Sequence, residues 1–151
     1  MINFKGKLTE KEKLEVSEIL SDLIDLYGDF YITRNNLRLF IKENIDLLFD
    51  CLNKGDKIAY GREGIALITG YSDKSSRKYV KILARDEDSA DKLLKIVSWN
   101  IDTELYCKLK KVNPLRYVFL NNNFIFRGNR GKELLLMKRS KGDKNVIRNK
   151  D

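Results

Sequence analysis

Histidine is absent from this 151-residue sequence, and cysteine, proline and methionine are scarce. Without histidine, Ser-His-Asp triads, Cys-His pairs and His-Glu-x-x-His zinc sites are excluded, which removes most hydrolases of familiar design. The two cysteines, Cys51 and Cys107, stand apart among apolar residues, so the sequence has neither a disulfide framework nor a Cys-x-x-Cys motif. We predict that both cysteines are core residues and that there is no metal site.

Long apolar runs are also missing. No segment approaches the roughly 18 to 20 apolar residues that a membrane span needs, and the first ten residues lack the apolar stretch and cleavage site of a signal peptide. We therefore expect a cytoplasmic protein without a membrane partner. A hydrophobic content of 42% and a charged content of 34% predict one domain with a substantial core.

Positive charge dominates, with a formal net charge of +8. From Lys138 to Asp151 there are six basic and two acidic residues, so this stretch carries 6 minus 2, or +4. Residues 1–139 are predicted to form the domain and residues 140–151 a basic C-terminal tail. Such a tail can follow the phosphates of nucleic acid, although solvated basic termini are also common without any partner.

The first half of the chain has helical periodicity. Thr9 and Glu12 form a capping-box pattern, which predicts a helix over 10–27. A second helix is expected from Asn35 or Asn36 to about Leu52, because apolar residues recur every three or four positions: Leu37, Phe40, Ile41, Ile45, Leu48 and Leu52.

After Gly55 the period changes to that of strands. Strands are expected at 58–60, 65–68, 79–84, 105–110, 124–127 and 133–139, with a short one at 2–4. Helical spacing returns twice. One helix should run to about Ile101 with Asp88 or Ser89 as its cap, and another should start at Asn113-Pro114 and end near Asn122. The turn before the last strand is expected at 128–131.

This order of elements resembles the fold of the GNAT N-acetyltransferase superfamily over residues 2 to about 139. The local resemblance is clearest from Asn113, which opens a helix, to Phe124, which starts a strand, and in the closing hairpin. Asn123 stands where the superfamily has glycine, and asparagine tolerates the same left-handed backbone. The resemblance implies an α+β fold, a central mixed sheet with two N-terminal helices and two further helices.

The resemblance also implies an acyl-CoA-dependent N-acetyltransferase that moves an acetyl group from acetyl-CoA to an unidentified amine. Backbone amides of one strand would hold the thioester carbonyl, and the next helix start would hold the pyrophosphate. The residues that match these cofactor-binding positions are Ile82, Leu83, Ala84, Arg85, Ser89, Ala90 and Asn113.

Two positions depart from the superfamily's pattern. The expected phosphate loop contains no glycine and instead carries four acidic residues, Asp86, Glu87, Asp88 and Asp91, which repel an anion. Leu120 stands where the superfamily has a tyrosine general acid.

Tyr117, one turn before Leu120, is the candidate that the resemblance leaves for catalysis, and Tyr106 is a second candidate acid. A base for the amine could be Glu63, Asp73 or Glu104, and their spacing selects none of them.

Two alternatives remain open from the sequence. A GNAT-like domain without cofactor binding would serve as an interaction module. A nucleic-acid-binding protein would use the basic tail, with Tyr106 available for base stacking, and a basic surface made of Lys108, Lys110, Arg127, Arg130 and Lys132.

Overall fold

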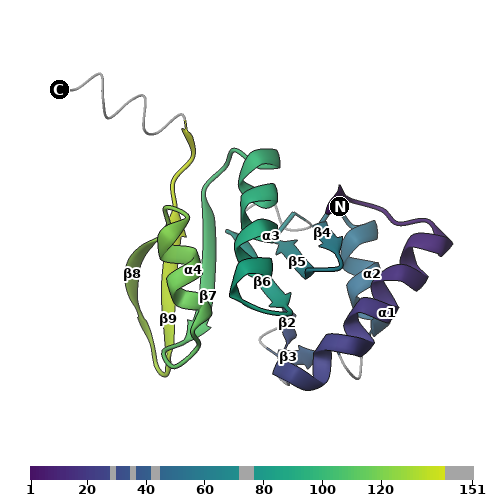
Figure 1. Ribbon diagram of the computed structural model, residues 1–151. Coiled ribbons are helices and arrows are strands. Elements are labelled where there is room, and N and C mark those ends of the chain that lie inside the picture. The colour runs from purple at the N-terminus through teal and green to yellow at the C-terminus, as the bar shows by residue number, and fades with distance from the viewer. Residues whose placement is uncertain (28–29, 35–36, 42–44, 72–76, 142–151) are drawn as a thin grey trace.

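The computed structural model describes residues 1–27, 30–34, 37–41, 45–71 and 77–141. Its centre is a mixed seven-stranded sheet with the strand order β1-β4-β5-β6-β7-β9-β8 (Figure 1). The strands are β1 (Asn3–Lys5), β4 (Lys57–Gly61), β5 (Gly64–Thr69), β6 (Lys78–Ala84), β7 (Leu105–Lys110), β8 (Ile125–Arg130) and β9 (Glu133–Lys138). Within this sheet β6 and β7 run parallel, and every other neighbouring pair is antiparallel.

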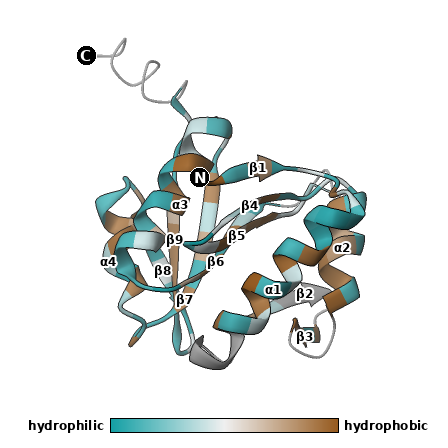
Figure 2. Ribbon diagram, turned by 45° about the vertical axis from the view of Figure 1, so that its right-hand side comes forward, coloured by the Kyte–Doolittle hydropathy of each residue, from teal (hydrophilic) through white to brown (hydrophobic). Residues whose placement is uncertain are grey.

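In the described part of the chain, helices lie on both faces of the sheet (Figure 2). Helices α1 (Glu10–Tyr27) and α2 (Ile45–Asn53) pack on one face, and α3 (Glu87–Asn100) and α4 (Leu115–Asn121) pack on the other. The predicted α+β architecture, with a mixed sheet, two N-terminal helices and two further helices, is confirmed. Each pair of helices packs on the sheet through its own apolar cluster, so the central strands are buried on both sides, whereas the edge strand β8 is largely exposed.

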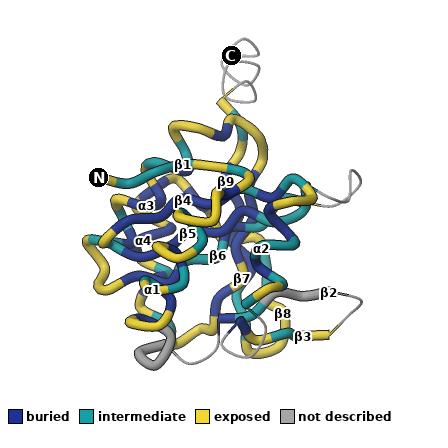
Figure 3. The backbone as a smooth tube through the Cα atoms, turned by 90° about the vertical axis from the view of Figure 1, so that its right-hand side faces the viewer, coloured by how far each residue is buried: buried dark blue, intermediate teal, exposed yellow. Residues whose placement is uncertain are grey.

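The centre of the sheet is the most deeply buried part of the chain, as the dark tube of Figure 3 shows. From Ile65 to Ile68 every side chain of β5 is buried, which confirms the predicted strand with two dry faces. Cys51 and Cys107 are buried, one in each of the two clusters, as predicted.

The helix caps were partly predictable. The Thr9 amide donates to Glu12 Oε1 at 2.9 Å and the Glu12 amide donates to Thr9 Oγ1 at 3.2 Å, so the predicted capping box is confirmed. The cap predicted for α3 was wrong. Asp86 is the N-cap, with an extended backbone and a side chain that accepts from the Ser89 amide at 2.7 Å.

A hairpin replaces the start of the second predicted helix. Strands β2 (Tyr31–Arg34) and β3 (Leu37–Phe40) form a separate two-stranded sheet, and α2 begins only at Ile45. The predicted start at Asn35 or Asn36 lies outside the described residues. Tyr31 pairs with Phe40, with their rings 6.1 Å apart in an edge contact, and the Arg38 guanidinium lies 4.8 Å from the Tyr31 ring. These cross-strand contacts stabilise a strand where the apolar spacing also fitted a helix.

The closing hairpin is longer than expected. Strand β8 continues to Arg130 and has a bulge between Phe126 and Gly128, so the turn is made at Gly131, whose φ is +63°. Asn123 has a φ of +71°, which confirms the predicted left-handed position before the strand.

Gly64 lets β5 approach β6 closely beside the site described next. Its φ is +134°, and a Cβ atom added there would lie 2.2 Å from the carbonyl oxygen of Leu83. Any other residue would push the two strands apart at this point.

Candidate active site

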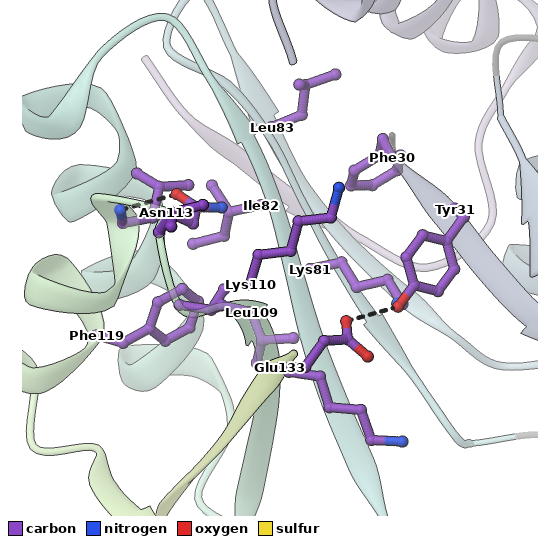
Figure 4. Close-up of a pocket in the computed structure, with 14 residues that line it drawn as sticks. Phe30, Tyr31, Lys81, Ile82, Leu83, Leu109, Lys110, Asn113, Phe119 and Glu133 are labelled. Carbon is purple, nitrogen blue, oxygen red and sulfur yellow. Dashed lines mark hydrogen bonds between the residues drawn. The ribbon is translucent and has the colours of Figure 1, made fainter. Parts of the chain in front are cut away.

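Strands β6 and β7 stay paired only at their first residues. Lys78 pairs with Leu105 and Tyr79 with Tyr106, and beyond these pairs the parallel strands separate. A cavity of about 160 Å³ lies where they separate (Figure 4). The residues that line it come from β2, β6, β7, β9, α4 and the connections beside them: Phe30, Tyr31, Val80, Lys81, Ile82, Leu83, Lys108, Leu109, Lys110, Val112, Asn113, Leu115, Phe119 and Glu133.

The pairing of β6 with β5 fixes which backbone amides face this gap. The amide of Arg85 donates to the carbonyl oxygen of Glu63 at 3.0 Å, so it points toward β5. Amides alternate between the two sides of a strand, and the register with β5 is unbroken from Gly64 onward. The Leu83 amide therefore also points toward β5, whereas the amides of Ile82 and Ala84 point toward the gap left by β7.

Side chains on the α3–α4 side make one half of the cavity apolar. Ile82 from β6 and Leu109 from β7 meet Leu115 and Phe119 from α4 there. Phe119 is held by an edge contact with Phe124, with ring centroids 5.0 Å apart. An apolar arm of a ligand can lie in this half without leaving polar groups unpaired.

The opposite half, which faces β2, is charged. Lys81, Lys108 and Lys110 line it together with Glu133 and Tyr31. Glu133 is the only carboxylate on the cavity wall within the described part of the chain. The cavity therefore has an apolar half on one face of the sheet and a polar half on the other, and the gap between β6 and β7 connects the two.

Glu133 is held in place by two residues of the hairpin. Its Oε2 accepts a hydrogen bond from the Tyr31 hydroxyl at 3.1 Å (Figure 4), and its Oε1 accepts one from Arg38 at 3.1 Å. The carboxylate keeps only a small exposed fraction, 13%. Charge-assisted hydrogen bonds of this kind fix both position and orientation.

Lys81 is a half-buried cation of the cavity wall. Its Nζ lies 4.1 Å from the centre of the Tyr31 ring. Burial lowers the pKa of Lys81 to about 8, Lys108 and Arg38 add to this effect, and Glu133 opposes it. The thiol of Cys107 on the neighbouring strand is buried, which raises its pKa.

Three of the predicted cofactor-binding residues, Ile82, Leu83 and Asn113, line the cavity. Ala84 is fully buried and faces the gap with its backbone amide only. Asn113 Oδ1 accepts from the Leu115 amide at 2.9 Å, so its side chain also starts α4, as expected. These positions fit the predicted role, which stays a prediction for each residue.

The other predicted residues lie at the start of α3, where the donors are already used. The Ser89 amide donates to Asp86 Oδ1 and the Ala90 amide donates to the Asp86 carbonyl oxygen at 3.0 Å. The hydrogen bonds from Ser89 lower the pKa of Asp86 and keep it charged. Arg85 Nε donates to the Arg62 carbonyl oxygen at 2.5 Å. A phosphate would have to displace this carboxylate to reach the Ser89 amide.

The predicted catalytic tyrosine, Tyr117, does not line the cavity. Its side chain is 54% exposed, and its hydroxyl oxygen accepts from the Arg116 guanidinium at 2.7 Å. Tyr106 is 7% exposed and donates to Glu104, a hydrogen bond that raises the pKa of its hydroxyl. Because Tyr106 is buried against Tyr79, with ring centroids 5.8 Å apart, it does not present a ring for base stacking.

The predicted bases also lie elsewhere. Glu63 is in the turn between β4 and β5, Glu104 precedes β7, and neither lines the cavity, while Asp73 lies outside the described residues. The sequence reasoning missed Glu133, Lys81 and Tyr31. A lone lysine in the apolar strand 79–84 was a usable signal for Lys81, because an unexplained charge in a buried strand indicates a site.

The residues that the structure describes include no group of three acidic, cysteine or histidine side chains placed to bind a metal ion. None of their helices is long and apolar enough to cross a bilayer.

No family model matches the chain, and no curated protein matches it significantly. Solved structures do match it along most of its length. An N-acetyltransferase from Staphylococcus aureus Mu50 aligns with a TM-score of 0.62 and 17% identity, over 92% of this chain and 97% of that one. A GNAT-family acetyltransferase from Streptococcus agalactiae 2603 aligns with a TM-score of 0.63 and 10% identity, over 93% and 96%.

A third structure, from Salmonella typhimurium, is assigned as an acetyltransferase and contains its cofactor acetyl-CoA. It aligns with a TM-score of 0.59 and 8% identity, over 91% of this chain and 93% of that one. The chain therefore has the fold of the GNAT acetyltransferases, which confirms the resemblance read from its element order. At these identities the likeness establishes the fold, and the activity has to be argued from the site.

Proposed function

We propose that this protein is an acyl-CoA-dependent N-acetyltransferase that moves an acetyl group from acetyl-CoA to an amine. The observation that carries the proposal is the separation of β6 and β7, with the amides of Ile82 and Ala84 facing the gap. A domain that served only for interaction has no need of such a gap, yet here the gap leaves a cavity of about 160 Å³. The acetyl-CoA of the Salmonella structure supports the same donor.

The cavity fits the acetyl-thioester end of the donor. Acetyl-CoA, when bound, supplies the activated acetyl group. Leu109, Leu115 and Phe119 offer an apolar wall for the thioester arm, and the amide of Ile82 offers a hydrogen bond to its carbonyl oxygen. The start of α3 does not fit the pyrophosphate, because the Asp86 carboxylate accepts from the Ser89 amide and further acidic residues follow at Glu87, Asp88 and Asp91. We therefore assign the donor's recognition to the thioester end.

The Ile82 amide is proposed to stabilise the negative charge that develops on the carbonyl oxygen. Donors that are fixed before the reaction need no reorganisation when the charge appears, and removing one such donor from an enzyme typically costs about 10²–10³ in kcat. The backbone of β6 is fixed by its pairing with β5 along the whole strand. The strand therefore presents a rigid donor.

The polar half is proposed to bind the acceptor amine. Glu133, held by Tyr31 and Arg38, is positioned to take a proton from the amine directly or through a water molecule. The nearby ammonium groups of Lys108 and Lys110 disfavour a further positive charge, so they shift an incoming amine toward its neutral, nucleophilic form. We assign no role to Tyr117, whose hydroxyl lies away from the cavity.

Thermal denaturation with acetyl-CoA, followed by a thiol-release assay with primary amines, tests this function. A ligand at 100 times its Kd stabilises the fold by about 2.7 kcal/mol. For a domain of this size, that stabilisation raises the melting temperature by roughly 5–10 °C. Amine-dependent thiol release should follow. An unchanged melting temperature at millimolar acetyl-CoA would overturn the proposal.

A further inference from the structure

Lys81 places a primary amine inside the proposed acyl-transfer site. It lies on β6 two residues beyond Tyr79, the last residue of β6 that pairs with β7. Its side chain lines the polar half of the cavity, and its Nζ lies over the Tyr31 ring (Figure 4). The next residue, Ile82, directs its amide into the gap. An amine and a donor for the thioester carbonyl therefore come from consecutive residues.

The surroundings of this amine favour its neutral form. Lys81 is half-buried, and burial lowers its pKa to about 8, so roughly half of the side chains are uncharged at that pH. Lys108 on β7 and Arg38 on β3 act in the same direction, and Glu133 on β9 and the Cys107 thiol act against it. A neutral amine has the lone pair that a nucleophile needs.

We propose that Lys81 is a site of self-acetylation, at which the protein transfers the acetyl group of a bound acetyl thioester to its own Nζ atom. This inference rests on the proposed function. The Nζ lone pair attacks the thioester carbonyl, the C–N bond forms and the C–S bond breaks. The thiolate leaves with the electron pair and takes up the proton that the nitrogen loses, which gives an amide and a free thiol.

Acetylation of Lys81 has a structural consequence for the same site. The side chain loses its charge and its attraction to the Tyr31 ring, and an acetyl group is added within the polar half. The modified side chain fills space that the acceptor amine needs. Self-acetylation would therefore reduce transfer to external amines.

Peptide mass spectrometry of the full chain after incubation with acetyl-CoA tests the proposal. Lys108 lines the same cavity and serves as the internal reference. We expect acetylation at Lys81 to exceed that at Lys108 by about tenfold or more, because only a correctly placed amine gains from proximity. Acetyl phosphate, a small donor without a thioester arm, should not give this preference. In the Lys81→Arg variant the preferred modification should be lost.

Two other results would overturn the inference, and they differ in what they leave standing. An unmodified Lys81 in a protein that acetylates an external amine would refute self-acetylation and leave the enzyme proposal intact. An unmodified Lys81 together with no effect of acetyl-CoA on the melting temperature would refute both.

Competitive labelling with trace acetic anhydride gives a readout without the donor: the reactivity of Lys81 should rise with a midpoint near pH 8. A midpoint near that of an ordinary lysine, about 10.4, would contradict the proposed nucleophile.

Discussion

The Tyr31 hydroxyl on β2 donates a hydrogen bond of 3.1 Å to Glu133 on β9, and so joins residues 102 positions apart in the chain. Arg38 on β3 binds the second oxygen of the same carboxylate. The small hairpin thus fixes the carboxylate that faces the acceptor half of the cavity. The hairpin β2–β3, which the sequence did not predict, therefore holds a residue with a proposed role in the reaction.

Replacing Glu133 tests the proposed base. The Glu133→Gln variant keeps the shape of the side chain but cannot take a proton, so kcat/KM for an amine should fall by about 10²–10⁴. Steady-state assays as a function of pH measure this loss. Glu104→Gln is the matched control, because Glu104 bonds to Tyr106 and lies off the cavity wall, and it should retain activity. Unchanged kcat/KM in Glu133→Gln would show that Glu133 is not the base.

The Ile82 amide can be removed without breaking the pairing of β6 with β5, because it points into the gap. Proline has no N–H group and is tolerated where that group is not part of a ladder. The Ile82→Pro variant should lose about 10²–10³ in kcat. Leu83→Pro provides the comparison, since it removes a donor to β5 and should lower the melting temperature more. A folded Ile82→Pro protein with full turnover would show that this amide does not stabilise the carbonyl.

Shortening the donor tests whether α3 holds the phosphates. Because the Asp86 carboxylate occupies the Ser89 amide and this helix start is acidic, acetyl-pantetheine should react with a kcat/KM within about tenfold of that for acetyl-CoA. Initial rates with both donors, at the same amine concentration, measure the ratio. A loss of several hundredfold would mean that the nucleotide end is bound strongly, and that the α3 start rearranges to do so.

Stability should depend on acid through Glu12. The hydrogen bond from Lys5 and the Thr9 amide lower the pKa of Glu12 to about 2, whereas an unfolded glutamate has a pKa near 4.3. Because the pKa of Glu12 is lower in the folded protein, its charged form stabilises the fold at pH values above the unfolded pKa. This contribution to the free energy of unfolding is lost as the pH falls toward 2. Urea unfolding between pH 5 and pH 2 should show a decline that is smaller in Glu12→Gln. An equal decline in both proteins would contradict this assignment.

Local signals in the sequence predicted much of the fold. The capping box at Thr9, the apolar run of β5 and the left-handed Asn123 all depend on neighbouring residues, and all three are confirmed. The hairpin β2–β3 was missed because its strands are stabilised by contacts with each other rather than by their own periodicity.

The site was less predictable than the fold. The gap arises because β6 and β7 pair only at their first residues. The sequence of one strand alone does not determine which of its residues pair with a parallel neighbour. Glu133 enters the cavity through contacts with Tyr31 and Arg38, which lie about a hundred residues away. The resemblance found Ile82, Leu83 and Asn113, which line the cavity, but it could not supply the charged residues of the acceptor half.

A titration of the ¹⁵N-labelled protein with acetyl-CoA, followed by amide NMR, tests the central claim most directly. We expect saturable shifts that are largest at the Ile82 and Ala84 amides, with those of Leu109 and Leu115 also affected and that of Ser89 nearly unchanged. Saturable shifts centred on Ser89 and Ala90, or no saturable shift at millimolar acetyl-CoA, would contradict the claim that the gap between β6 and β7 receives the thioester.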